Sequence, residues 1–151
     1  ETFEFAAELV RKGAKLKEIC RIALRKKSKA HCELEKIIYD RLEFLEDGKI
    51  AFAYLNLEDY ENTHAEMGDD EGLVEMLRDI EDVEVAVLLK EKEGANGYKA
   101  SLRSHETVNV SDICMLLGGG GHRGAAGCFI NGTLDQAKTK IINAVKQGLK
   151  K

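Results

Sequence analysis

Apolar positions in the first third of the chain recur at helical spacing. They predict one helix over residues 2–13, which Gly13 is suited to end, and a second helix over residues 16–24. Ser28 is a suitable N-cap for a third, longer helix, which the apolar positions extend to Asp47-Gly48. No chemical motif occurs in these residues, so we expect a helical packing or connecting layer.

From residue 50 onward the spacing becomes that of strands. Residues 50–55 are a continuous apolar run, typical of a strand that is covered on both faces. Residues 83–91 alternate with a period of two and predict another strand. Asn96-Gly97 is a strong hairpin signal, and residues 98–103 beyond it form the most regular two-faced strand. The polar face of this strand carries Lys99, Ser101 and Arg103, a row that, taken alone, favours a solvent-facing surface.

Three further helices and a short strand complete the pattern. One helix is predicted over residues 73–80 and another over 110–117, the second capped by Asn109 or Ser111. A strand follows over residues 128–130. The last helix begins with a capping box formed by Thr133 and Gln136.

Length and charge narrow the classes of partner. The 151 residues suffice for one domain, or for one domain with an extension. The formal net charge of -4 excludes a global basic field for duplex nucleic acid but is compatible with a local site for a short single strand or a small anion. Because the chain opens on Glu1 inside a predicted helix, we expect it to be part of a longer protein.

Compartment is indicated by what the pattern lacks. No run of about 20 apolar residues predicts a membrane span, and no signal peptide is recognisable. The four cysteines are scattered, which favours a reducing cytoplasm and buried thiols over a disulfide framework. Residues 56–72 hold seven acidic side chains and His64, ligand types that suit a metal, but their spacing matches no ligand pattern, and we favour a solvated loop.

Residues 118–127 place six glycines in ten positions around His122 and Arg123. Flexible tethers are richer in serine, so a tight, ligand-facing turn is the favoured interpretation. A P-loop string is absent. Gly119-x-Gly121-x-x-Gly124 matches the dinucleotide fingerprint, but a helix precedes it and no acid follows at the required distance, so we reject it. What the pattern predicts is an anion-binding turn with backbone N–H groups and two side-chain donors, although a hydrogen-bonded turn histidine would also explain His122.

These residues together resemble a known family. The segment Tyr98-Lys99-Ala100-Ser101-Leu102-Arg103-Ser104, Val110-Ser111 and the glycine run with Ala125-Ala126-Gly127 are similar to the DHH-associated domain, the substrate-binding domain of DHH phosphoesterases. The nearest branch is that of bacterial oligoribonucleases that also remove the 3′-phosphate of phosphoadenosine phosphate. The resemblance implies an α/β fold with a mixed β-sheet flanked by helices, over residues 48–151, preceded by a helical connector over residues 1–47.

The resemblance also implies roles for individual residues. Arg103 and His122 would contact a substrate phosphate, and the backbone of Gly119, Gly120 and Gly121 would cradle it, with Ser104 and Arg123 as additional contacts. In the family an N-terminal DHH lobe holds two manganese ions and performs hydrolysis. No Asp-His-His string occurs here, so we expect no catalytic residue and no metal bound by this chain, and inactivity of the chain alone.

Expected partners follow in the same way: short single-stranded RNA or a phosphorylated nucleotide, the DHH lobe, no membrane, and a second copy as a homodimer. Two other functions stay open. The same domain ends alanyl-tRNA synthetases, where it serves tRNA binding and dimerisation, and Arg25, Lys26, Lys27 and Lys29 would suit an RNA backbone. The other open function is that of a nucleotide sensor without a hydrolytic partner.

Overall fold

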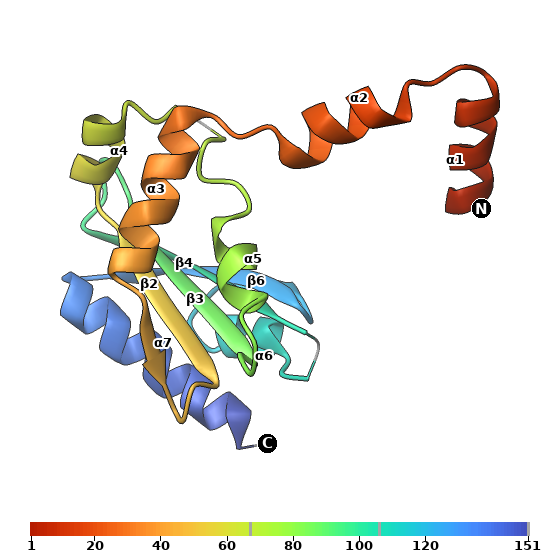
Figure 1. The fold of residues 1–151 in the computed structure, drawn as a ribbon. Helices are drawn as coiled ribbons and strands as arrows, with labels where there is room; N and C mark the ends of the chain where they lie inside the picture. Colours follow the sequence, from red (N-terminus) through yellow and green to blue (C-terminus); the bar gives the residue numbers. More distant parts are fainter. Residues whose placement is uncertain (67, 106, 151) are drawn as a thin grey trace.

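A computed structural model describes residues 1–66, 68–105 and 107–150, so Lys151, the end of the predicted domain, lies outside the described residues. Within them the fold is α/β, as predicted, and its sheet has the order β1-β2-β3-β4-β6-β5 (Figure 1). The β2–β3 pair is parallel and the other pairs are antiparallel, so the sheet is mixed. The strands are β1 (Glu43–Leu45), β2 (Ile50–Leu55), β3 (Val85–Glu91), β4 (Gly97–Ser104), β5 (Gly120–His122) and β6 (Ala125–Asn131).

Helices cover the two faces of the sheet unequally. On one face α6 (Val110–Met115) and α7 (Leu134–Leu149) pack on β3, β4 and β6 and enclose one apolar core. On the other face α3 (Lys29–Asp40), α4 (Leu57–Thr63) and α5 (Leu73–Arg78) enclose a second core against β2 and β3. β2 is therefore buried on both faces, as its apolar run predicts. Because the second helical layer centres on β2 and β3, the outer half of the sheet on that side is left open.

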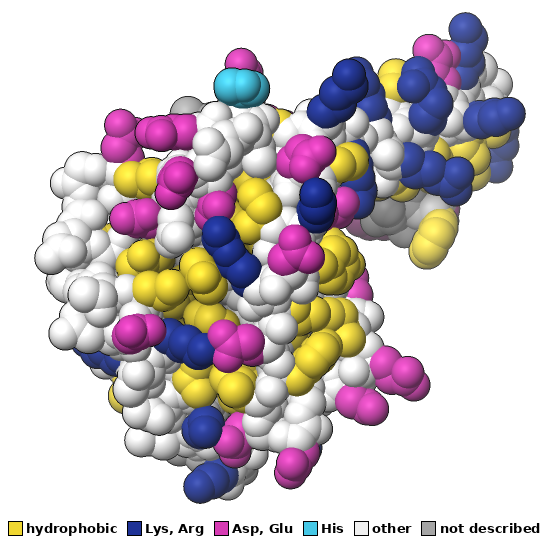
Figure 2. All heavy atoms as spheres, turned by 60° about the vertical axis from the view of Figure 1, so that its left-hand side comes forward, with side chains coloured by type: hydrophobic (Ala, Val, Ile, Leu, Met, Phe, Trp, Pro, Cys, Tyr) yellow, Lys and Arg dark blue, Asp and Glu magenta, His cyan; other side chains and the backbone are white. Residues whose placement is uncertain are grey.

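The N-terminal segment projects from this body. It consists of α1 (Thr2–Arg11), α2 (Leu16–Cys20) and one π-helical turn, η1 (Arg21–Arg25), and in Figure 1 it extends well away from the sheet. None of its helical residues is buried. The two predicted helices are thus confirmed, with the last turn of the second widened to π geometry. Figure 2 shows basic side chains gathered over this segment, with apolar ones between them.

The third helix is shorter than predicted. The Ser28 hydroxyl accepts a hydrogen bond from the His31 N–H at 2.9 Å, which confirms the N-cap. The helix ends at Asp40, however, and residues 43–45 form β1, which pairs with β2. Asp47-Gly48 is the tip of that hairpin, with positive φ at both residues, and is not a helix end. Apolar spacing alone could not show that strand pairing would prevail there.

The acidic stretch is also more ordered than the loop we expected. Residues 57–63 form α4, and the Asp59 carboxylate accepts the Asn56 N–H at 2.6 Å as part of a capping box. Asp59 is buried and forms a bidentate pair with Arg41, at 2.6 and 2.8 Å. The pair Asn56 and Asp59, which forms a capping box, could have predicted this helix within the acidic stretch.

The remaining structural predictions concern thiols and membranes. All four cysteines are free; Cys114 and Cys128 are buried in the core, while Cys32 is exposed. The Asn109 side chain caps α6, and Thr133 and Gln136 form the predicted capping box of α7. Across the described part of the chain, no helix combines the length and apolar character needed to cross a bilayer.

Candidate functional site

The predicted polar row on β4 lines a concave surface. Lys99, Ser101 and Arg103 alternate with buried residues, as their spacing predicts. They border a hollow of about 400 Å³, here called the β4 hollow, together with Lys90 of β3 and Glu75 of α5. The row therefore forms one wall of a polar cavity and is not a flat solvent-facing surface.

Arg103 is held in the β4 hollow by two hydrogen bonds. Its Nε donates to Oε1 of Glu75 at 2.7 Å, and its Nη1 donates to the Leu102 carbonyl at 3.0 Å. Among the described residues, Nη2 has no partner. The guanidinium is thus oriented on one side and keeps a donor for a ligand on the other, the arrangement needed for charge-assisted binding of an anion.

The two lysines of the hollow differ in their surroundings. Lys90 donates to Asp70 at 2.7 Å, and the Tyr60 hydroxyl donates to the same carboxylate at 2.9 Å. Burial and the adjacent Asp70 charge raise the pKa of Tyr60, so this hydroxyl stays protonated. Lys99 lies opposite Lys90 in the β3–β4 register, is exposed, and has no ion pair within the described residues. Lys99 and Nη2 of Arg103 are therefore the cationic groups available to a ligand.

The glycine run is built differently from the turn we predicted. Residues 120–122 form β5, an edge strand that pairs antiparallel with β6. A Cβ on Gly119 would lie 2.2 Å from the Gly127 carbonyl oxygen, and one on Gly121 would lie 2.5 Å from that of Ala125. The prediction of a turn was wrong for residues 120–122, where the glycines allow the close approach of two strands, and a turn forms at residues 123–124.

The register nevertheless brings the two main candidates to one face. Arg103 is opposite Ala125 of β6, and Ala125 is opposite His122 of β5. Directly paired residues project to the same side of a sheet, so Arg103 and His122 flank a floor of small side chains, about 10 Å apart at two strand spacings. The next row repeats this with Ser101, Gly127 and Gly120. We call this surface of β4, β6 and β5 the open face.

Two other predicted residues lie elsewhere. The Ser104 side chain points to the opposite side of the sheet, where it is buried and donates to the Val108 carbonyl at 2.7 Å. Its backbone N–H binds the Gly124 carbonyl at 3.0 Å and so ties β4 to the end of the glycine run. Arg123 borders a separate hollow of about 230 Å³ beside α6 and α7, with Asn109 and Asp112.

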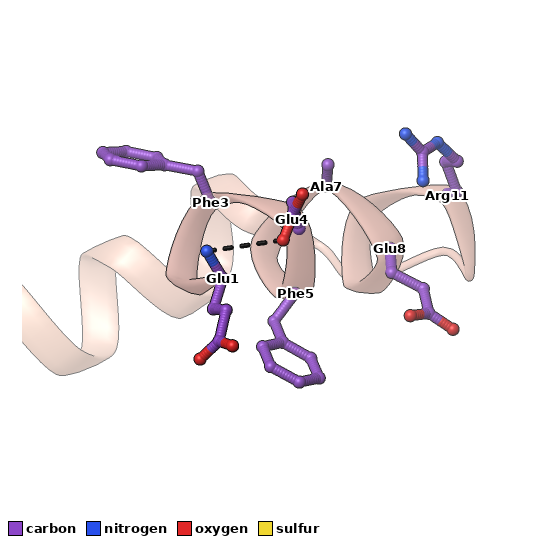
Figure 3. A pocket seen from close by; sticks show the side chains of 7 residues that line it. All are labelled: Glu1, Phe3, Glu4, Phe5, Ala7, Glu8 and Arg11. Atoms are coloured by element: carbon purple, nitrogen blue, oxygen red, sulfur yellow. Dashed lines mark ion pairs between the residues drawn. The ribbon is translucent and has the colours of Figure 1, made fainter.

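The connector borders a hollow of about 470 Å³, which Lys26 and Lys27 line together with Glu35 of α3 and Glu75 of α5. The basic residues considered for RNA lie where η1 leads into α3, and Lys27 there donates to Glu35. A hollow of about 680 Å³ along α1 is lined only by side chains of that helix and its N-cap. Phe3 and Phe5 point apart there (Figure 3). Within the described residues no group of three or more His, Cys, Asp or Glu side chains could hold a metal ion, so they do not fit a two-metal centre.

Sequence reasoning missed Glu75, Lys90 and Phe129 of this region. Glu75 and Lys90 sit in elements that read simply as helix and strand, and only the fold brings them to Arg103 and Lys99. Phe129 could have been found, because a strand extended to residues 125–131 alternates and puts Phe129 on the face opposite Cys128 and Ile130.

Comparison with known proteins agrees with this fold. The DHHA1 domain family matches residues 47–151. The chain is 34% identical over 151 residues to the bifunctional oligoribonuclease and PAP phosphatase NrnA of Thermus thermophilus, covering 99% of this chain and 44% of that protein. The chain thus spans less than half the length of this relative.

Two solved structures share the fold. An exopolyphosphatase-related protein from Bacteroides fragilis superposes with a TM-score of 0.88 at 24% identity, covering 97% of this chain and 43% of the other. A pGpG-specific phosphodiesterase from Vibrio cholerae gives a TM-score of 0.52 at 13% identity, covering 80% and 40%.

Proposed function

Because the chain belongs to the DHHA1 domain family, we propose that it is the substrate-binding domain of a phosphoesterase that hydrolyses oligoribonucleotides, phosphoadenosine phosphate, or both. The observation that carries this proposal is the alignment of Arg103 and His122 across the small-residue floor of the open face. A phosphate placed on that floor meets a guanidinium donor from one side and an imidazole donor from the other.

The remaining candidates act around this contact. The backbone of Gly119, Gly120 and Gly121 borders the floor at the sheet edge, where Gly120 leaves room because nothing lies within 4 Å of its Cβ position. Ser104 and Arg123 act on the site through backbone hydrogen bonds. The Ser104 N–H donates to the Gly124 carbonyl, and the Val110 N–H donates to the Arg123 carbonyl, both at 3.0 Å. Both hydrogen bonds fix the turn at residues 123–124, which directly follows His122.

In this proposal the chain binds and orients the nucleotide substrate, and a DHH lobe hydrolyses its phosphoester bond. Manganese ions held in that lobe would supply an activated water for hydrolysis, and all of their ligands would come from the lobe. Large apolar side chains on α1 and α2 are exposed, Phe3 at 91% and Leu9 at 59%, and they would pack against the lobe or against a second copy. The free thiols fit a cytoplasmic location.

Substitution of Arg103 tests the proposal. We expect Arg103→Ala to weaken binding of a 5′-phosphorylated nucleotide by about ten- to a hundredfold, since a hydrogen bond to a charged group is worth roughly 1.5–3 kcal/mol. Isothermal titration calorimetry on the 151-residue chain measures the change. Lys140→Ala is the matched control, because this exposed lysine lies on α7 behind the sheet. Equal affinity of Arg103→Ala and the unaltered chain would remove Arg103 from the site.

Two further measurements separate the other functions. The chain should hydrolyse neither oligoribonucleotides nor phosphoadenosine phosphate when manganese is added, and robust turnover would contradict a purely binding role. Filter binding with tRNA over a range of salt tests the RNA alternative, because several phosphate contacts give a steep salt dependence. Tight tRNA binding that survives Arg103→Ala would favour that alternative.

A further inference from the structure

An aromatic side chain shares the open face with Arg103 and His122. Phe129 lies on β6, two and four residues beyond Gly127 and Ala125, so it projects to the same side. It is directly opposite Lys99 of β4. Phe129 is 39% exposed and belongs to neither apolar core, although its strand neighbours Cys128 and Ile130 are buried on the other face.

The ring has a defined position. A Cβ built on Gly97 would lie 2.8 Å from Cζ of Phe129, so the ring reaches across the start of β4 into space that only a glycine leaves empty. The ring therefore leans toward the row of Gly97 and Asn131, on the side of Phe129 away from Ala125, and remains on the open face. An exposed aromatic beside an unpaired lysine is the combination that binds single-stranded nucleic acid: stacking for the base and charge for the backbone.

We propose that Phe129 is a stacking platform for a nucleobase, and that the ligand of the open face is a dinucleotide or a longer single strand. This inference rests on the proposed function. Phe129 and Ala125 are four residues apart, about 13 Å along β6. That spacing exceeds the separation between a base and its own 5′-phosphate. The base on Phe129 is therefore that of the next nucleotide, and Lys99 meets the phosphate that joins the two.

The absence of tryptophan from the sequence provides a direct probe. Phe129→Trp introduces a single tryptophan whose fluorescence a stacked base quenches. We expect quenching by the 5′-phosphorylated dinucleotide pApA and none by the mononucleotide pA. Phe44→Trp is the matched control, because Phe44 is 52% exposed on β1, four strands away in the same sheet, and should not respond.

Affinities provide an independent readout. Phe129→Ala should weaken pApA binding about tenfold and change pA binding less than twofold, while Phe129→Tyr should bind pApA like the unaltered chain. Thermal melting of each variant confirms that it is folded at the titration temperature. Equal affinity of the unaltered chain for pA and pApA, with no quenching in Phe129→Trp, would overturn the inference.

The two proposals fail separately. If Arg103→Ala weakens both ligands while pApA gains nothing from Phe129, the nucleotide site stands and the stacking platform does not. Quenching of Phe129→Trp by pA would place the first base on this ring and overturn the assignment to a dinucleotide. If Arg103→Ala changes nothing, the proposed function itself fails.

Discussion

At the scale of single residues, the cationic side chains of the β4 hollow differ in how fully a carboxylate pairs with them. Glu75 contacts only Nε of Arg103, and Nη2 has no partner among the described residues. Asp70, in contrast, receives both the Lys90 ammonium and the Tyr60 hydroxyl and so ties the segment before α5 to β3. We therefore assign Arg103 to binding and Asp70 to stability.

The role of Asp70 predicts a pH dependence. Burial by itself raises the pKa of Asp70, but the Lys90 ammonium and the Tyr60 hydroxyl outweigh it and hold the pKa below its ordinary value. Because the folded pKa is the lower one, this stabilisation is complete above about pH 4 and is lost as the pH falls through the folded pKa. Asp70→Asn should therefore melt below the unaltered chain at neutral pH, and the gap should narrow in acid.

Thermal melts from neutral pH to about pH 2 check this prediction. Asp40→Asn is the control, since Asp40 is exposed at the end of α3 and has no ion pair within the described residues. A gap between Asp70→Asn and the unaltered chain that stays constant as the pH falls would contradict the assignment.

At the scale of elements, the sequence predicted those strands and helices whose apolar and polar residues alternate regularly. The alternation in β4 placed Lys99, Ser101 and Arg103 on one face, and the structure confirms it. The sequence could not predict β5, because Gly-Gly-His has no alternation of apolar and polar residues and becomes a strand only through pairing with β6. The alignment of Arg103 with His122 depends on that pairing, so the candidate residues were predictable from the sequence but their geometry was not.

Two adjacent glycines of the run are expected to have different roles: Gly119 in packing and Gly120 in ligand binding. Gly119→Ala should lower the melting temperature by about 3–10 °C, because a Cβ there would lie 2.5 Å from Cβ of Cys128, and overpacking costs roughly 1–3 kcal/mol. Gly120→Ala should change stability by less than about 0.5 kcal/mol. Its Cβ instead projects onto the floor of the open face and should weaken nucleotide binding.

Melting and calorimetry on the two variants measure both effects. The prediction is a dissociation: Gly119→Ala loses stability, and Gly120→Ala loses affinity while remaining as stable as the unaltered chain. Two variants that lose stability equally would show that the run acts as one packing unit and that Gly120 has no separate place in the site.

At the scale of the whole molecule, the body and the projecting segment differ in how they are stabilised. α3 contributes Leu34 and Ile38, both 0% exposed, to the core beneath β2 and β3. The helices α1 and α2 contribute no buried residue. Their apolar side chains can be buried only by another surface, which we propose is the DHH lobe.

Two deletions test this division. Removal of residues 1–20 should change the stability of the body by less than about 0.5 kcal/mol and nucleotide affinity less than twofold, because no buried contact is lost. It should abolish binding to a separately produced DHH lobe, measured by calorimetry. Removal of residues 1–40 is the contrasting variant: it takes Leu34 and Ile38 from the core, where each truncated side chain costs about 2–5 kcal/mol, and should prevent cooperative folding. If the shorter deletion melts as poorly as the longer one, α1 and α2 are part of the folded body; if it still binds the lobe, the docking surface lies elsewhere.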